Sequence, residues 1–589
     1  MDVAGSIALV KVVQAVLLVV AALGLTAYKW PDNAVVTDDA VYDYIVVGAG
    51  SAGSIVANRL TENPNVHVLL VEAGGDPPIE TAIPAMFAFL PKSTIDWNFV
   101  SENDGYSAQY HRNGYLNLPS GKVLGGSSSI HHYYYIRGHA NDYESWANAT
   151  GEDSWSWNNL LPYFKKSENL VDEEILNSST GQYHGTNGYT VITRELREMP
   201  LKYLEAFREV GSKVVDDINT GNTLGYTRPM VFIGNGIRQS SAESFLSPIK
   251  NRSNLHLLKE TTIDKILFDD KKNAVGVQAS RNGEILNIYA REEVIVSAGA
   301  FNSPKLLMLS GIGPEAHLKS MGIKLVADLP VGENMQDHLA VILVHKMEKT
   351  SGIPKLENPF KFPIPTFVGL DALNTDQGYP DYLTLNLIVR SNPLNLLLLC
   401  ATVFGLHNDV CEQLAKAGQR REILVTIFNV ARPLSRGKVM LRSNYPQDPP
   451  IIYTGFLSNS TDLENNAAFI EKFIKVTESS YFRNVSAETL YFDLPNCRGL
   501  QQNTREYWKC YVLNMMDMTF HYSSTCRMGS VLDAELKVLG VNKLRVVDAS
   551  AMPNMVSGNI NAAVMVLAEK AADLIKKDSD QYSVGPWMT

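Results

Sequence analysis

A glycine-rich turn near the N-terminus has the residue types and the spacing that suit a phosphate-bearing dinucleotide. The chain reads GAGSAG from Gly48 to Gly53, directly after an apolar run at 42–47 that is typical of a buried strand. Gly48 allows a tight turn, Gly50 lets the backbone approach a pyrophosphate, and Gly53 lets a following helix pack closely on the strand. Glu72 ends the next apolar run, and its carboxylate can accept hydrogen bonds from ribose hydroxyls. This pattern predicts dinucleotide binding and disfavours a 2′-phosphate, but it does not choose between FAD and NAD.

The elements that must position this turn are short and regular. We expect a helix over 54–60 and a second strand over 66–71, so that strand, turn, helix, strand and acid follow one another in about 30 residues. The start of the helix offers free backbone N–H groups and the positive end of its dipole to the phosphates. We therefore predict Ser51 and Ala52 as cofactor contacts, in addition to the glycines and Glu72.

Further motifs, spread over most of the chain, identify a family. They read GKVLGGSSSIHHYYYIRGHANDYE at 121–144, GAFNSPKLLMLSGIG at 299–313, GENMQDH at 332–338, HYSSTCRMG at 521–529 and LRVVDASAMPNMVSGNINAAVMVLAEKAADLI at 544–575. Together with GAGSAG, these motifs resemble the glucose–methanol–choline (GMC) family of FAD-dependent oxidoreductases, and the sequence looks most like the insect branch. The resemblance extends from about residue 42 to 576.

The resemblance implies an α/β fold in two parts. One part is a discontinuous, Rossmann-like FAD-binding domain, and the other is an α+β substrate domain built on an antiparallel sheet. The strand expected at 544–547 and the helix expected from 562 to 575 agree with a return of the chain to the first domain. The predicted segments are a signal peptide (1–27), the FAD domain (40–150 and 226–335), a mixed or substrate-domain segment (151–225), the substrate domain (336–520), the C-terminal return to the FAD domain (521–576) and a tail (577–589).

The resemblance also implies which residues carry the reaction. Oxidation of an alcohol needs a base for the hydroxyl proton and an acceptor for the hydride, and flavin N5 is the acceptor in this family. His521 matches the catalytic histidine of the family, and an imidazole suits the role of base. Asn559 matches the second catalytic position, where it can hydrogen-bond the substrate oxygen but cannot act as a base. No motif indicates a metal site.

Other positions resemble FAD contacts of the family. They are Gly125, Gly126, Ser127, His131, Ile263, Asp548, Ala549 and Asn561. His131 stands where the family usually has an asparagine beside the flavin. Some relatives attach FAD covalently through a histidine of this loop, but the matching position here is Ile130, so we predict non-covalent FAD, with a link through His131 as the alternative.

The substrate is less well defined than the cofactor. The segment 393–407 is unusually apolar, and it is either a wall for a bulky apolar alcohol or a buried core helix. Tyr133, Tyr134 and Tyr135 could line the same site or belong to packed strands. We expect oxidation of a ring hydroxyl of a steroid, with O₂ as acceptor. The alternatives are a sugar or aromatic alcohol with another acceptor and, as a different class, an FAD-containing hydroxynitrile lyase.

Composition and the N-terminal residues bear on location and partners. The 589 residues are 45% apolar and carry a net charge of −10, which suits a large folded enzyme and not a nucleic-acid-binding protein. The apolar run at 12–27 is shorter than a bilayer requires and resembles a cleavable secretory leader, although an uncleaved anchor is the alternative. We therefore expect a secreted protein without stable membrane association. Five N-x-S/T sequons agree with secretion, at Asn148, Asn177, Asn251, Asn459 and Asn484.

Five cysteines are too few to form a disulfide scaffold. In an oxidising compartment Cys400 could pair with Cys411 and Cys497 with Cys510, which would leave Cys526 over. Five buried free thiols are the alternative.

Overall fold

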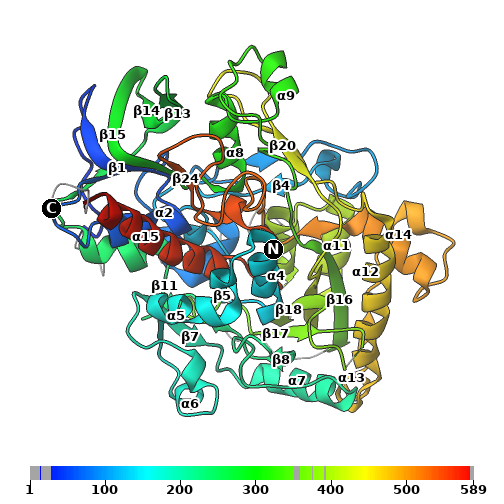
Figure 1. Ribbon diagram of the computed structural model, residues 1–589. Coiled ribbons are helices and arrows are strands. Elements are labelled where there is room, and N and C mark those ends of the chain that lie inside the picture. The colour runs from blue at the N-terminus through cyan, green and yellow to red at the C-terminus, as the bar shows by residue number, and fades with distance from the viewer. Residues whose placement is uncertain (1–13, 15–27, 350–357, 375, 391–392, 584–589) are drawn as a thin grey trace.

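The computed structural model describes residues 14, 28–349, 358–374, 376–390 and 393–583 (Figure 1). Apart from Gln14, the predicted leader lies outside the described residues. Among the helices that the structure describes, none combines the length and the apolar character needed to cross a membrane.

One half of the molecule is built on a mostly parallel sheet. Its strands come from three separate parts of the chain, and their order is β12-β2-β1-β15-β14-β13, with β24 also paired to β15. Neighbours among β12, β2, β1, β15 and β24 run parallel, whereas β13, β14 and β15 form an antiparallel meander. The bounds are β1 Val41–Val47, β2 Val68–Val71, β12 Leu255–Leu258, β13 Thr262–Phe268, β14 Ala274–Arg281, β15 Glu284–Val296 and β24 Leu544–Val546. The prediction of a discontinuous α/β domain is therefore confirmed.

Two helices lie together on this sheet. Helix α2 (Ser51–Leu60) follows β1 through the glycine turn, and α15 (Asn561–Ser583) packs alongside it, as Figure 1 shows. The close approach of α2 to β1 requires Gly53, because a Cβ there would lie 1.9 Å from the carbonyl oxygen of Gly48. Helix and strand can therefore pack only if position 53 carries no side chain.

The other half is built on an antiparallel sheet. The strand order is β22-β16-β19-β18-β17-β8, with β23 paired to β16. The bounds are β8 Gly225–Thr227, β16 Leu339–Lys349, β17 Thr366–Asp371, β18 Tyr382–Arg390, β19 Arg421–Val430, β22 Glu488–Thr489 and β23 Asp517–Met518. Helices α12 (Ser460–Phe473) and α14 (Arg505–Met515) pack against each other beside this sheet (Figure 1). The predicted antiparallel substrate-domain sheet is thus present, whereas the segment boundaries proposed from the sequence stay predictions.

Each half has its own hydrophobic core, and smaller elements join the halves. A four-stranded sheet links β5 (Tyr134–Tyr135), β6 (Glu168–Leu170), β7 (Thr190–Arg194) and β9 (Met230–Val231). Both expected disulfides are present, Cys400–Cys411 and Cys497–Cys510, and Cys526 is a buried free thiol. The alternative of five free thiols is therefore wrong.

Candidate active site

One cavity of about 280 Å³ collects most of the residues predicted to act on cofactor or substrate. It begins at the carboxyl ends of β1 and β2, the usual place for a ligand in an open α/β sheet, and reaches His521 and Asn559. The predicted residues that line it are Gly48, Gly50, Ser51, Ala52, Glu72, Gly126, Ser127, His131, Ile263, His521, Asp548, Ala549, Asn559 and Asn561.

Gly53 and Gly125 lie behind the wall of this cavity. Gly53 serves the packing of α2 on β1, as described above. Gly125 adopts a positive φ of 86°, and its amide donates to the carbonyl of Ala49 at 2.8 Å. This bond ties the second glycine loop to the GAGSAG turn, so Gly125 shapes the cavity without lining it.

The middle of the cavity is formed by the main chain of two glycine loops and by the N-termini of two helices. A Cβ at Gly126, which has a φ of 54°, would lie 2.7 Å from the Cα of Gly50, so position 126 has no room for a side chain. Helices α2 and α15 both begin at the cavity, where the Ser51 hydroxyl donates to Asn561 Oδ1 at 2.7 Å. Two helix N-termini thus present positive dipole ends and N–H groups in one place, which suits the pyrophosphate of a dinucleotide.

The two carboxylates that were predicted to contact the cofactor, Glu72 and Asp548, differ in how many acceptor sites they leave free for a ligand. Both oxygens of Glu72 accept backbone N–H groups, from Ala49 and Gly74 at 2.9 Å each, and burial raises its pKa to about 7. Each oxygen still has a lone pair for a ribose hydroxyl. Asp548 accepts four bonds, from the Gly299 amide, the Ser303 hydroxyl, and the amide and hydroxyl of Ser550. Its carboxylate is therefore saturated, and only the backbone at this position remains available to a ligand.

The cavity wall also contains polar atoms that have no hydrogen-bond partner among the residues that the structure describes. They are the Ser297 hydroxyl, His131 Nε2 and Asn559 Oδ1. Buried polar groups in proteins normally find a hydrogen bond, so their common position facing one cavity indicates a polar ligand. Together with the close glycine loops and the two helix starts, these atoms fit a flavin dinucleotide.

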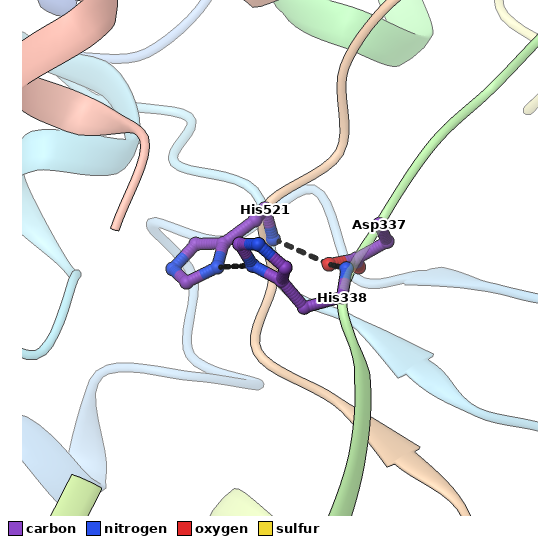
Figure 2. A group of neighbouring side chains, drawn as sticks. All are labelled: Asp337, His338 and His521. Carbon is purple, nitrogen blue, oxygen red and sulfur yellow. Dashed lines mark hydrogen bonds between the residues drawn. The ribbon is translucent and has the colours of Figure 1, made fainter. Parts of the chain in front are cut away.

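His521 lies at the far end of the cavity in a hydrogen-bonded cluster (Figure 2). Its Nδ1 lies 2.7 Å from Nδ1 of His338 and 3.0 Å from the Thr519 hydroxyl. Its backbone amide donates to Asp337 Oδ1 at 3.0 Å, and the amide of His338 donates to the same oxygen at 2.7 Å. On the other side of the ring, the Asn559 amide group donates to Nε2 of His521 at 2.9 Å.

These contacts define the protonation of His521. Because Nε2 accepts a hydrogen bond from Asn559, the ring proton lies on Nδ1, where it is donated to His338. Burial, with the neighbouring histidines His338, His132 and His131, lowers the pKa of His521 well below its ordinary value of 6.5. His521 is therefore neutral at neutral pH, with its unprotonated nitrogen directed at Asn559.

The same three residues, Asp337, His338 and His521, form a group whose ligand atoms could surround a metal ion. Two histidine nitrogens bound to one zinc ion at 2.0–2.1 Å with tetrahedral angles lie about 3.3 Å apart. The 2.7 Å between the two Nδ1 atoms is shorter and matches a shared proton. The geometry favours a hydrogen-bonded pair over a metal site.

Non-glycine residues with a positive φ lie next to the histidines at the reacting end of the cavity. Phe520, which precedes His521, has a φ of 63°, and Tyr133, which follows His131 and His132, has a φ of 68°. Non-glycine residues in this region cost about 1–3 kcal/mol each and are concentrated at functional sites. The two strained residues are direct neighbours of His521 and His132, which line the same cavity.

A second, smaller cavity of about 40 Å³ adjoins the first. The two cavities share His132, Tyr133, Tyr134, Thr519, Phe520 and Asn559. The rest of its lining is apolar apart from backbone, namely Phe87, Phe362, Pro363, Ile364, Leu385, Leu387, Leu399, Val403, Phe404, Ile427 and Met518. Three of these residues come from the apolar segment 393–407, which forms α10 (Pro393–Leu398) and a π-helix (Leu399–Val403). That segment is both a cavity wall and part of the core of this half.

Sequence reasoning missed several residues that the structure brings to the site. His338 stands in the quoted GENMQDH motif, which could have drawn attention to it, but its sequence distance from His521 hides the contact. Thr519, His132 and Phe520 carry no signal of their own apart from lying next to predicted residues. The tyrosine run divides, because Tyr133 and Tyr134 line both cavities while Tyr135 joins the core of the FAD-type half.

Fold and site together define a dinucleotide-binding α/β enzyme with a neutral imidazole and an amide at the reacting end. Comparisons with known proteins name its family. Family models described as GMC oxidoreductase match residues 42–340 and 433–568. An ecdysone oxidase of Bombyx mori is 38% identical over 585 residues, covering 95% of this chain and 85% of that protein. A glucose dehydrogenase (FAD, quinone) of Drosophila melanogaster is 34% identical and covers 92% of this chain and 87% of that protein.

Solved structures agree. A formate oxidase of Aspergillus oryzae superimposes with a TM-score of 0.79 at 27% identity, covering 93% of this chain and all of that one. The chain therefore belongs to the GMC oxidoreductase family. The predicted class, an FAD-dependent oxidoreductase that acts on alcohol donors, is confirmed at this level.

Proposed function

We propose that this chain oxidises a steroid alcohol, ecdysone to 3-dehydroecdysone, with O₂ as electron acceptor. The observation that carries the proposal is the apolar second cavity, which Asn559, the hydrogen-bond partner of His521, lines together with the first cavity. The similarity to an ecdysone oxidase over nearly the whole chain supports it. When bound, FAD supplies the two-electron acceptor for the hydride.

His521 would take the hydroxyl proton of the substrate. A hydroxyl placed between Nε2 of His521 and the amide of Asn559 would donate to the first and accept from the second. Once Nε2 holds that proton, both ring N–H groups need an acceptor. Nδ1–H already has one in His338, so the pair supports the charged imidazolium inside a buried site. In this mechanism His338 positions the base and does not itself touch the substrate.

The remaining predicted residues would hold the cofactor. Glu72 and Ile263 would contact the ribose and adenine end. The backbone of Gly48, Gly50, Ser51, Ala52, Gly126, Ser127, Asp548 and Ala549 would hold the phosphates and the ribityl chain, while Gly53 and Gly125 would act by packing. His131 and Asn561 would face the flavin without a covalent bond.

The walls of the second cavity suit an apolar substrate. A rigid steroid nucleus has few polar groups, and the lining from β18, β19 and the π-helix offers almost none. The cavity is smaller than a steroid, so binding requires the rings of Phe87, Phe362 and Phe520 to move apart. A small polar sugar would gain little from the same walls.

We also propose that the protein is secreted and glycosylated. Asn148, Asn177, Asn251 and Asn484 are exposed in the structure, as acceptor sites must be. Asn459 differs, because it is only half-buried and its side chain caps α12 by accepting from the Thr461 amide. Two disulfides agree with an oxidising compartment.

Anaerobic reduction of the bound flavin tests the proposal. Ecdysone, glucose and salicyl alcohol are added to separate samples of the FAD-loaded protein, and the absorbance near 450 nm is followed. We expect ecdysone to bleach the flavin and air to restore it. His521→Asn should slow bleaching about 10²- to 10⁴-fold, the contribution of a general base. His67→Asn, at a largely exposed histidine, should not.

Each outcome has a distinct meaning. Bleaching by glucose but not by ecdysone would make the steroid assignment wrong and leave the mechanism intact. Bleaching without recovery in air would point to a dehydrogenase with another acceptor. Loaded flavin that no alcohol bleaches would contradict the roles of His521 and Asn559 and favour the lyase.

A further inference from the structure

Within the part of the chain that the structure describes, a buried arginine behind the glycine loop has no anionic partner. Arg238, at the end of β11 (Ile237–Arg238), is 2% exposed. Its Nε donates to the carbonyl of Thr81 at 2.8 Å, and its Nη1 donates to the carbonyls of Ser128 at 3.3 Å and His131 at 2.7 Å. Its Nη2 has no hydrogen-bond partner in the described ranges. Its guanidinium lies over the Tyr133 ring at 3.9 Å, and among the described residues it forms no ion pair.

Other buried arginines of this protein show how unusual this is. Arg59 pairs with Glu569, Arg137 with Glu168, Arg194 with Asp172 and Arg545 with Glu293, at 2.6–2.8 Å. A buried charge without a counter-charge is costly, so proteins almost always pair it. Guanidinium stays charged inside proteins. Arg238 therefore places an uncompensated positive charge in the interior.

His131 connects this charge to the cofactor cavity. Its Nδ1 accepts from Arg238 Nη1 at 3.0 Å and from the Tyr133 amide at 3.2 Å. Because Nδ1 accepts, the ring proton of the neutral imidazole lies on Nε2. Nε2 is buried without a protein partner, and the ring of His131 lines the cavity. His131 also contributes to the electrostatic environment of His521, so it lies toward the reacting end.

We propose that Arg238, acting through the Nε2–H of His131, creates a positive potential on the flavin ring and so favours electron uptake by the bound FAD. Two-electron reduction that brings one proton adds one negative charge to the ring. A buried cation and an aligned N–H donor stabilise that charge, because a low-dielectric surrounding screens them little. The inference concerns the flavin and is independent of which alcohol is oxidised.

Sulfite is the probe for this potential. It adds to oxidised flavin and leaves negative charge on the ring, and its dissociation constant is read from the visible spectrum of the FAD-loaded protein without any substrate. Arg238→Met removes the charge and should raise the sulfite dissociation constant at least tenfold. The two-electron midpoint potential should fall in step, by about 30 mV for each tenfold change. Arg238→Lys keeps the charge and should stay within about threefold of the wild type.

A double-mutant cycle tests the connection through His131. His131→Phe keeps a ring against Phe232, 5.2 Å away, but removes both nitrogens. It should weaken sulfite binding by itself, and Arg238→Met added to it should have less effect than in the wild type, because the two residues act as one unit. Arg291→Met, at an exposed arginine, removes one charge far from any such path and should change nothing.

Two results would overturn the proposal. One is an FAD-loaded Arg238→Met protein that binds sulfite as tightly as the wild type. The other, which decides the matter if Arg238→Met does not load FAD, is an unchanged sulfite affinity in His131→Phe. A purely structural role of Arg238 would lower thermal stability or FAD content while leaving the affinity of the loaded fraction unchanged.

Discussion

The two halves of this protein are held together in different ways. The half with the parallel sheet contains buried ion pairs, such as Arg59 with Glu569 and Arg545 with Glu293. The half with the antiparallel sheet contains both disulfides. The two ends of the active site also differ in the groups that form their walls. The cofactor end includes glycine loops whose main chains approach each other closely, whereas the substrate end is made of large side chains from several distant elements.

This difference predicts which positions of the active site can be substituted without loss of function. A wall made of backbone tolerates almost no substitution, because an added Cβ meets another main chain. A wall made of side chains can be changed one residue at a time, because the framework behind it is held by disulfides and strand pairing. Cofactor binding should therefore respond to mutation in an all-or-none way, and substrate choice should respond in steps. Substitutions at the two ends of the active site test this contrast.

Gly126→Ala should abolish FAD binding and therefore all activity. The new Cβ would lie 2.7 Å from the Cα of Gly50, and the residue would keep a φ of 54°. We expect a folded but colourless protein, measured by the ratio of flavin absorbance to protein. Gly105→Ala is the matched control, because its φ is 69° but no atom lies within 4 Å of its Cβ position. A Gly126→Ala protein that still binds FAD would contradict the expected difference between the cofactor end and the substrate end.

His338→Phe should retain FAD and slow substrate reduction of the flavin. It removes the acceptor of His521 Nδ1–H while keeping a ring in place. Losing a buried hydrogen-bond partner costs about 1–3 kcal/mol, which corresponds to a rate about 5- to 150-fold lower. His345→Phe, at another fully buried histidine whose nitrogens lack partners, should leave the rate unchanged. Stopped-flow reduction distinguishes them.

The wild-type rate should also show a defined pH dependence. Because burial lowers the pKa of His521 well below 6.5, the base is already neutral there. Lowering the pH from 8 through 6.5 should therefore leave the reduction rate on its plateau, and the rate should decline only in more acid solution. A midpoint at or above 6.5 would contradict the buried, neutral imidazole.

Removing the Cys400–Cys411 disulfide should impair substrate binding more than cofactor binding. This bridge joins the π-helix that carries Leu399 and Val403 to α11 (Asn408–Ala417). The double alanine variant should lose about 2–4 kcal/mol of stability and raise KM while keeping its FAD. The matched control removes Cys497–Cys510, whose cysteines line neither cavity. It should lower Tm similarly without changing KM. If removing either disulfide raised KM equally, the position of the π-helix would not depend on the Cys400–Cys411 disulfide.

The smallest expected effect concerns a buried histidine in the first half. His184 lies between Glu168 Oε1 at 3.0 Å and Asp217 Oδ2 at 2.9 Å, and these hydrogen bonds raise its pKa above 6.5 despite burial and the nearby charge of Arg137. Its charged form therefore stabilises the fold fully below pH 6.5, and this contribution is lost as the pH rises through the raised pKa. Tm should fall over that interval more steeply in the wild type than in His184→Gln. If Tm fell equally steeply with pH in both proteins, this would contradict the raised pKa of His184.

Much of the first half could be predicted from the sequence alone. The strand at 41–47, the helix that follows and the acid after β2 depend on local periodicity and on glycine sterics, which neighbouring residues decide. The two cysteine pairs could be named from the sequence as one of two alternatives, and the structure decided in their favour. His521 and Asn559 could be named from motifs, but motifs do not state how they meet.

Tertiary structure alone decided the contacts between distant residues. His338 and His521 are 183 positions apart, and no local pattern requires their rings to share a proton. Arg238 shows no sequence sign that it lacks a carboxylate, because pairing depends on which side chains packing brings near. Asp548 was predicted as a cofactor contact, and only the fold reveals that its carboxylate is already saturated. The turn and helix after β1 follow from neighbouring residues along the chain, whereas side-chain partners are set by how the two sheets and their connecting loops pack.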